Sequence, residues 1–166
     1  MYKVIFIFFI CFFTFQNVSR GEAMNSSGAD KAVAFFKNLD KDHMELVDEF
    51  YDQNVDFQDP VHKLKGAVAV RNYYAQLYKN VKSIRFEFSK TISQGNNAVL
   101  VWKMFLVTPD LNGGREFSVD GNSVFLFGED GKALSHRDFF DMGEFIYERV
   151  PVLKSVIGII KGKLGN

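Results

Sequence analysis

The stretch that decides the fold is IRFEF, residues 84–88, in which apolar and charged side chains alternate one by one. A period of two is typical of a β-strand with one face buried and the other in water. Turn residues, among them the pair Gly113-Gly114 and Gly131, divide the chain that follows. The sequence therefore predicts a four-strand antiparallel meander with its other strands at 98–107, 115–127 and 133–140.

Upstream of this stretch the apolar residues recur at the three-and-four spacing of helices. Ser27 or Asp30 is expected to cap the first helix. The predicted helices are 27–39, 43–51 and 66–78, with a short strand at 55–58. Three helices before a meander predict an α+β fold, in which they pack on one face of a cone-shaped, curved antiparallel sheet.

The length of 166 residues favours a single domain, which we place at 24–166 with 142–164 as a helical tail. Within the tail, Pro151 starts an extra C-terminal amphipathic helix with lysines beside an apolar stripe. One interpretation is that this helix closes the wide end of the sheet or packs on the partner in a homodimer. The other is that it makes weak contact with a membrane surface.

Residues 1–23 have the order of a secretory signal peptide: Lys3, the apolar run 4–15, and a small residue, Ala23, at the possible cut. The run is shorter than the roughly 20 residues that a spanning helix needs. The signal peptide implies a secreted or periplasmic protein. In the alternative, Met24 is the true start and the protein is cytoplasmic.

Composition excludes several classes of function. The formal net charge is +0 and no basic run is present, which argues against binding to nucleic acid. The single cysteine, Cys11, and three histidines without ligand spacing predict no metal site. The absence of a glycine-rich phosphate loop predicts no cofactor. The 19 phenylalanines predict either a hydrophobic ligand pocket or a bulky core.

The segment 51–60, followed by Gly66 and Tyr73-Tyr74, resembles ketosteroid isomerase and SnoaL-like proteins of the nuclear-transport-factor-2-like superfamily. The ending 136–141, with Tyr147-Glu148, resembles the last strand and tail of SnoaL-like members. The resemblance covers residue 32 to the C-terminus and implies a cone with a closed apolar pocket. Isomerases, cyclases, dehydratases, epoxide hydrolases and non-catalytic binding proteins share this fold, so the fold does not fix the function.

Within this resemblance, Asp59 falls on the general base of the isomerase, although an Asp before Pro also simply starts a turn. Tyr51 and Tyr74 match its supporting tyrosines. Phe35 stands where the isomerase has the tyrosine that donates to the substrate oxyanion, and Ser123 lies near the position of the assisting acid. Loss of both donors argues against an efficient steroid isomerase.

The last strand offers a second arrangement. Period-two geometry places His136, Asp138 and Phe140 on one face, and the resemblance points that face into the cone. Asp138 then resembles the final-strand acid of SnoaL-like cyclases and epoxide hydrolases, with His136 able to tune it. The alternative is a buried structural ion pair anchored by Tyr74 or Trp102. An epoxide hydrolase also needs an arginine, and segment 99–107 has only a lysine as a charge.

Three functions follow as hypotheses. The first is acid–base chemistry on a small hydrophobic molecule, with Asp59 and Asp138 transferring protons and His136 as modulator. Its pocket walls would include Phe35, Trp102, Phe125 and Phe140. The second is a non-catalytic binding or carrier module for such a molecule. The third is a structural homodimer that associates through Phe86, Phe88 and Phe139 on the outer face of the sheet.

Overall fold

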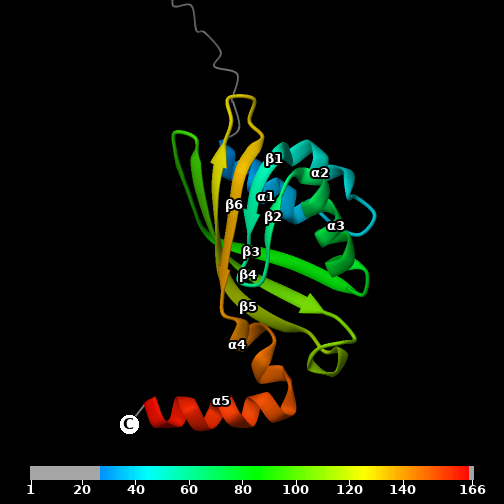
Figure 1. The fold of residues 1–166 in the computed structure, drawn as a ribbon, viewed down its shortest axis with the longest axis vertical. Coiled ribbons are helices and arrows are strands. Elements are labelled where there is room, and N and C mark those ends of the chain that lie inside the picture. Colours follow the sequence, from blue (N-terminus) through cyan, green and yellow to red (C-terminus); the bar gives the residue numbers. More distant parts are fainter. Residues whose placement is uncertain (1–26, 165–166) are drawn as a thin grey trace, which may run out of the picture.

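A computed structural model describes residues 27–164, so the predicted signal peptide and the alternative start at Met24 lie outside the described residues. Six strands form one curved sheet in the order β2-β1-β6-β5-β4-β3. Figure 1 shows α1, α2 and α3 on one side of this sheet and α5 at its lower end. The helices are α1 (Gly28–Asn38), α2 (Glu45–Phe50), α3 (Ala67–Tyr78), α4 (Met142–Phe145) and α5 (Pro151–Leu164). The strands are β1 (Tyr51–Gln58), β2 (Lys63–Lys65), β3 (Ser83–Gln94), β4 (Asn97–Val107), β5 (Phe117–Phe127) and β6 (Ala133–Phe140).

The predicted α+β class and antiparallel meander are confirmed, because β3 to β6 pair in chain order. The pairing of β1 was not foreseen. It lies parallel to β6, with Phe57 opposite His136, and β2 pairs with its outer edge. As a result β6 has a hydrogen-bonded neighbour on each side, and the parallel partner is supplied from far upstream in the chain.

The boundary between the second helix and β1 differs from the prediction. The helix ends at Phe50, and the strand begins at Tyr51 and not at Val55. The register of β1 against β6 shifts between Tyr51 and Asp56, so the strand lacks an unbroken alternation of buried and exposed residues. Such an irregularity hides the period of two from the sequence.

The first helix is capped as one of the two alternatives predicted. The Ser27 hydroxyl accepts from the Asp30 N–H at 3.2 Å, and the Asp30 carboxylate accepts from the Ser27 N–H at 3.1 Å. This reciprocal capping box satisfies two donors that a helix start leaves free. At the other end of the chain, the first part of the predicted helical tail, before Pro151, divides into α4 and a 3₁₀ turn, Tyr147–Arg149.

The sheet edge at β3 is irregular. A bulge between Phe88 and Lys90 interrupts the pairing with β4, and residues 89–94 beyond it are all exposed. Before the bulge, Phe86 and Phe88 face the core, where Phe86 lies 5.0 Å from Phe36 between ring centroids. The prediction that both phenylalanines lie on the outer face is therefore wrong, and of that trio Phe139 alone is exposed.

Three tyrosines lie inside the aromatic core: Tyr51, Tyr74 and Tyr78, each less than a tenth exposed. Burial is the main reason that the pKa of each phenol is raised above its ordinary value, with the negative charge of Asp138 as a further cause. The core therefore holds these phenols in their neutral form.

We expect stability to fall above about pH 10, where tyrosines of the unfolded chain ionise. The folded chain retains those protons, so the free energy of unfolding decreases with pH by up to about 1.4 kcal/mol per pH unit for each buried tyrosine. Tyr78→Phe removes one such contribution and should flatten the slope measured by urea unfolding between about pH 9 and pH 11. Surface lysines also titrate in this pH range, but they contribute equally to the slopes of the wild type and the variant. Equal slopes in the two proteins would therefore contradict this account of the buried tyrosine.

Gly121 lies within β5 and makes room for a ring. It pairs with Trp102 across β4 and β5, and a Cβ there would collide with the indole. We expect Gly121→Ala to lower the free energy of unfolding by about 1–3 kcal/mol. Urea unfolding followed by the fluorescence of this single tryptophan measures it. Gly158→Ala in α5, where a Cβ meets nothing within 4 Å, is the control and should not destabilise.

Candidate functional site

An interior cavity of about 100 Å³ lies between the helices and the sheet. Its walls are mostly aromatic and apolar, and two carboxylates, Asp59 and Asp138, face it. The remaining lining residues are Phe36, Phe57, Tyr73, Tyr74, Leu77, Tyr78, Ile84, Phe86, Trp102, Met104, Phe140 and Phe145. A convergence of few polar groups in an apolar cavity is the usual character of a small-molecule site.

The two oxygens of Asp138 have different surroundings. Oδ1 accepts from the Ser123 hydroxyl at 2.5 Å and lies 2.8 Å from Nε2 of His136. Within residues 27–164, no hydrogen-bond partner is found for Oδ2, and the side chain is 14% exposed. One oxygen is thus fixed by the protein, which leaves the other available to a molecule in the cavity.

Hydrogen bonds behind Asp138 fix its orientation. The buried His136 places Nδ1 2.6 Å from the Tyr51 hydroxyl, which lies 3.3 Å from that of Tyr74. The ring donates from Nε2 to Asp138, and Nδ1 shares a hydrogen bond with the Tyr51 hydroxyl, which shares another with Tyr74. From the other side, the Trp102 indole donates to Ser123 at 2.8 Å. Both chains therefore end with a donor directed at the same carboxylate oxygen.

Asp59 is held more completely. Its Oδ1 accepts from the backbone N–H groups of Val61 at 2.7 Å and His62 at 2.5 Å, and the Tyr73 hydroxyl donates to Oδ2. Burial, followed by this hydrogen bond, raises the pKa of the Tyr73 phenol well above its ordinary value. Asp59 thus starts a turn, as one alternative proposed, and also faces the cavity. Both of its oxygens are already in use.

The structure brings half of the ten predicted site residues to the cavity wall, places four behind it and leaves Phe35 outside. Asp59, Tyr74, Trp102, Asp138 and Phe140 line the cavity. The four residues behind it are Tyr51, Ser123, Phe125 and His136, which support the wall through hydrogen bonds or, for Phe125, through stacking on His136 at 4.2 Å. The predicted common face of His136, Asp138 and Phe140 is confirmed, because all three side chains turn inward.

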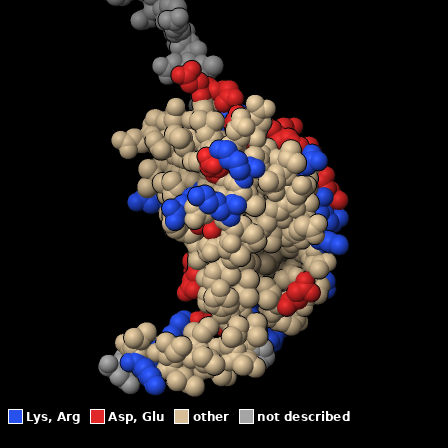
Figure 2. Space-filling model, in the orientation of Figure 1, with Lys and Arg blue, Asp and Glu red and all other residues tan. Residues whose placement is uncertain are grey.

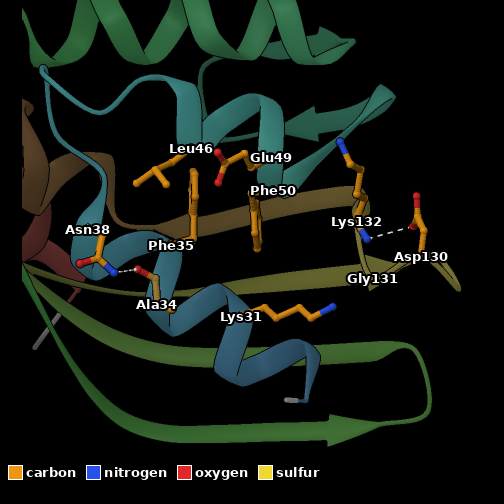
Figure 3. Close-up of a pocket in the computed structure, with 10 residues that line it drawn as sticks. All are labelled: Lys31, Ala34, Phe35, Asn38, Leu46, Glu49, Phe50, Asp130, Gly131 and Lys132. Atoms are coloured by element: carbon orange, nitrogen blue, oxygen red, sulfur yellow. Dashed lines mark hydrogen bonds between the residues drawn. The ribbon is translucent and has the colours of Figure 1, made fainter. Parts of the chain in front are cut away.

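Phe35 does not line the interior cavity. It stacks on Phe50 with ring centroids 4.3 Å apart, and both rings line an outer groove of about 400 Å³. Figure 3 shows this groove between α1, α2 and the turn that carries Asp130, with Lys31 and Lys132 at its rim. None of the charged side chains in its lining is buried, so the groove lacks the shielded acid of the interior cavity.

A second hollow, of about 300 Å³, lies outside the same two carboxylates. Asp59 and Asp138 line both this hollow and the interior cavity, and Arg137 stands beside them on the outer side. The carboxylates therefore lie where the interior meets a surface depression.

Sequence reasoning missed several lining residues. Tyr73 was part of the family motif but was given no role, although its hydroxyl is the one that binds Asp59. Phe86 was assigned to the outer face, and Phe145 belongs to a short helix that no pattern connected with the cavity. Within residues 27–164, no group of three His, Cys, Asp or Glu side chains could hold a metal ion.

Comparison with solved structures places this geometry in a known fold. An NTF2-like protein of unknown function from Burkholderia pseudomallei aligns with a TM-score of 0.65 and 16% identity, over 75% of this chain and 98% of that one. A candidate SnoaL-like polyketide cyclase from Shewanella denitrificans gives 0.63 and 14%, over 71% and 93%. An LEH-like epoxide hydrolase from M. tuberculosis gives 0.61 and 14%, over 78% and 94%. At such identities these likenesses establish the fold alone.

No curated protein matches this sequence. The family model of the SnoaL-like domain matches residues 32–136, which include most of α1, all of α2 and α3, Asp59 and His136, and end two residues before Asp138. The six-stranded curved sheet, its three covering helices and this match agree with one another. The chain belongs to the SnoaL-like domain family, with the NTF2-like cone fold.

Proposed function

We propose that this protein is an acid–base enzyme that acts on a small, mostly apolar substrate in the interior cavity. The observation that carries the proposal is the asymmetry of Asp138: Oδ1 is fixed by Ser123 and His136, and Oδ2 has no partner among the described residues. A general base needs a carboxylate that is held in place and is still free to take a proton. Asp59, with both oxygens occupied, is the less suitable of the two.

The chemistry is a proton transfer at carbon. Oδ2 of Asp138 takes a proton from the carbon beside a substrate carbonyl, the C–H electron pair moves into an enolate, and the neutral acid returns the proton to the same or a conjugated carbon. Return of the proton to the opposite face of the same carbon inverts its stereochemistry, and return to a conjugated carbon moves the double bond. Attack by the enolate carbon on another group of the substrate closes a ring. The related structures include a candidate cyclase and an epoxide hydrolase, so the fold accommodates more than one kind of reaction.

The surroundings restrict the substrate. The hydroxyl and N–H donors around the carboxylates, those of Tyr73, Tyr74, Ser123 and Trp102, are each directed at another protein group. Of the hydroxyl and indole donors that line the cavity within residues 27–164, the Tyr78 hydroxyl alone has no hydrogen-bond partner. A substrate whose oxygen does not reach Tyr78 must therefore stabilise its own negative charge by conjugation. The volume of about 100 Å³ is below the usual range for ligand sites and suits one small ring or chain.

The internal pairing of the cavity's donors also favours a second candidate function, a carrier of a small hydrophobic molecule. Most donors of this cavity are satisfied by other protein groups, so an apolar molecule can bind there and leave few polar groups unpaired. In that case Asp138 is the end of a structural hydrogen-bond network. The two functions differ in one respect: an enzyme loses turnover and keeps its ligand when Asp138 becomes uncharged, whereas a carrier has no turnover to lose.

We expect Asp138→Asn to reduce the isomerisation of small β,γ-unsaturated ketones, beginning with 3-cyclopentenone, by about 100-fold or more. Formation of the conjugated enone is followed by ultraviolet absorbance, and binding by quenching of Trp102, which lines the cavity. Asp120→Asn is the matched control, since Asp120 is exposed and pairs with Lys103 on the outer side, and it should retain full activity.

The outcomes separate the candidates. Turnover by the wild type that survives Asp138→Asn contradicts the assigned base. If the ketone quenches Trp102 fluorescence in the wild type but is not turned over, the result supports the carrier. If the wild type shows neither quenching nor turnover, this substrate class is rejected.

A further inference from the structure

Helix α5 extends away from the rest of the molecule and carries an exposed apolar stripe. Figure 1 shows the helix below the sheet, with its C-terminal end pointing away from the strands. We call this the α5 stripe; its side chains are between 42% and 82% exposed: Val152, Leu153, Val156, Ile159, Ile160 and Leu164. Soluble proteins rarely leave a contiguous apolar surface of this kind without a partner.

The charges of α5 are all of one sign. The helix contains Lys154, Lys161 and Lys163 and no acidic residue. Lys161 pairs with Glu148 of the preceding turn, and the other two lysines have no ion-pair partner within the part of the chain described. In Figure 2 the lower lobe formed by this segment is largely uncharged on the side shown, with lysine or arginine atoms near its tip.

Residues beside the helix extend the same surface. Tyr147 is 43% exposed and Val150 is 38% exposed, directly before α5. A tyrosine with an exposed ring and basic residues around an apolar stripe are typical of segments at a membrane–water boundary, where rings and lysine stems lie among lipid headgroups.

The length of α5 determines how it can meet a bilayer. Its 14 residues span about 21 Å, less than the ~30 Å of a hydrocarbon core. Among residues 27–164, no helix is both long and apolar enough to cross a membrane. An amphipathic helix of this kind lies in the plane of the interface, with its apolar side inserted and Lys154 and Lys161 toward the headgroups. Lys163 lies on the apolar side near the C-terminal end of the helix, and its long stem lets the ammonium group reach the headgroups.

We propose that α5 binds the surface of an anionic lipid bilayer through the α5 stripe and its lysines. A second copy of the chain is a poorer partner for this surface. Antiparallel pairing of two α5 helices buries both stripes, but it also brings together Lys154 and Lys163 of each copy, four lysines without an acidic partner, and like charges at an interface are unfavourable. An anionic headgroup layer supplies the missing opposite charge.

Binding of this kind also determines which part of the protein faces the lipid. Helix α4 and the Tyr147–Arg149 turn connect α5 to the sheet, and Phe145 of α4 lines the interior cavity. Arg149 fixes this connection, with its guanidinium 3.9 Å from the Phe117 ring centroid and a hydrogen bond of 3.4 Å to the Ser118 carbonyl. The bilayer would therefore lie next to the Phe145 end of the cavity.

The test is co-sedimentation of the full-length chain with vesicles of phosphatidylcholine, with and without one-third phosphatidylglycerol. We expect binding to the anionic vesicles that weakens with salt. Val156→Asp combined with Ile160→Asp should abolish it, and these positions are about half exposed, so the fold should tolerate the change. Val68→Asp is the matched control: Val68 is 69% exposed at the start of α3 and should bind as the wild type does.

Charge is tested separately. Lys154→Gln combined with Lys163→Gln should weaken binding to the anionic vesicles by about 5-fold per lysine. Equal binding by the wild type and the double aspartate variant would overturn the proposal, because residues shared by both would then carry the affinity. Failure of the wild type to bind would overturn it as well. So would a wild-type dimer in sedimentation that the same variant converts to a monomer, because a second copy would then cover the stripe.

Discussion

One buried histidine, with a partner on each ring nitrogen, determines much of the surrounding structure. His136 is 1% exposed, and the rings of Phe57 and Phe125 pack against it, so its polar atoms depend on protein partners. The Tyr51 hydroxyl is hydrogen-bonded to Nδ1, and the Asp138 carboxylate is hydrogen-bonded to Nε2. Because Tyr51 begins β1 and the other two residues lie on β6, the same hydrogen bonds hold two strands that are distant in sequence in a defined register. Leaving either nitrogen unpaired would cost about 1–3 kcal/mol.

Much of the fold was readable in the sequence where buried and exposed residues alternate without a break. The limits of β6 were predicted correctly at 133–140, and β3 begins at Ser83, one residue from the predicted alternation. The start of β1 was not predicted, because its register shifts after Tyr51. Strand β2 was missed because three residues with two exposed lysines carry no hydrophobic pattern. Local patterns record burial, and they record pairing between distant strands only weakly.

The site was predictable to the same degree. The inward face of His136 and Asp138 follows from spacing along one strand, and the structure agrees. By contrast, spacing cannot tell which side of a strand faces the concave surface, so Phe86 was placed outside although it lines the cavity. The positions of Phe35 and Phe145 depend on how separate helices pack, and no local pattern encodes that. The family resemblance located the acids, whereas their hydrogen bonds distinguish a held carboxylate, Asp59, from one with a free oxygen, Asp138.

The bulge in β3 has a consequence for self-association. Strand edges are templates for the addition of further strands, and a sheet with two regular edges can grow into an aggregate. Here one edge is the three-residue β2, which begins with Lys63 and ends with Lys65, and the other is bent between Phe88 and Lys90. A chain approaching β3 would have to follow the bend and bury a lysine beside it. The molecule thus protects its sheet from edge-to-edge growth, and any ordered assembly has to use its faces or its helices.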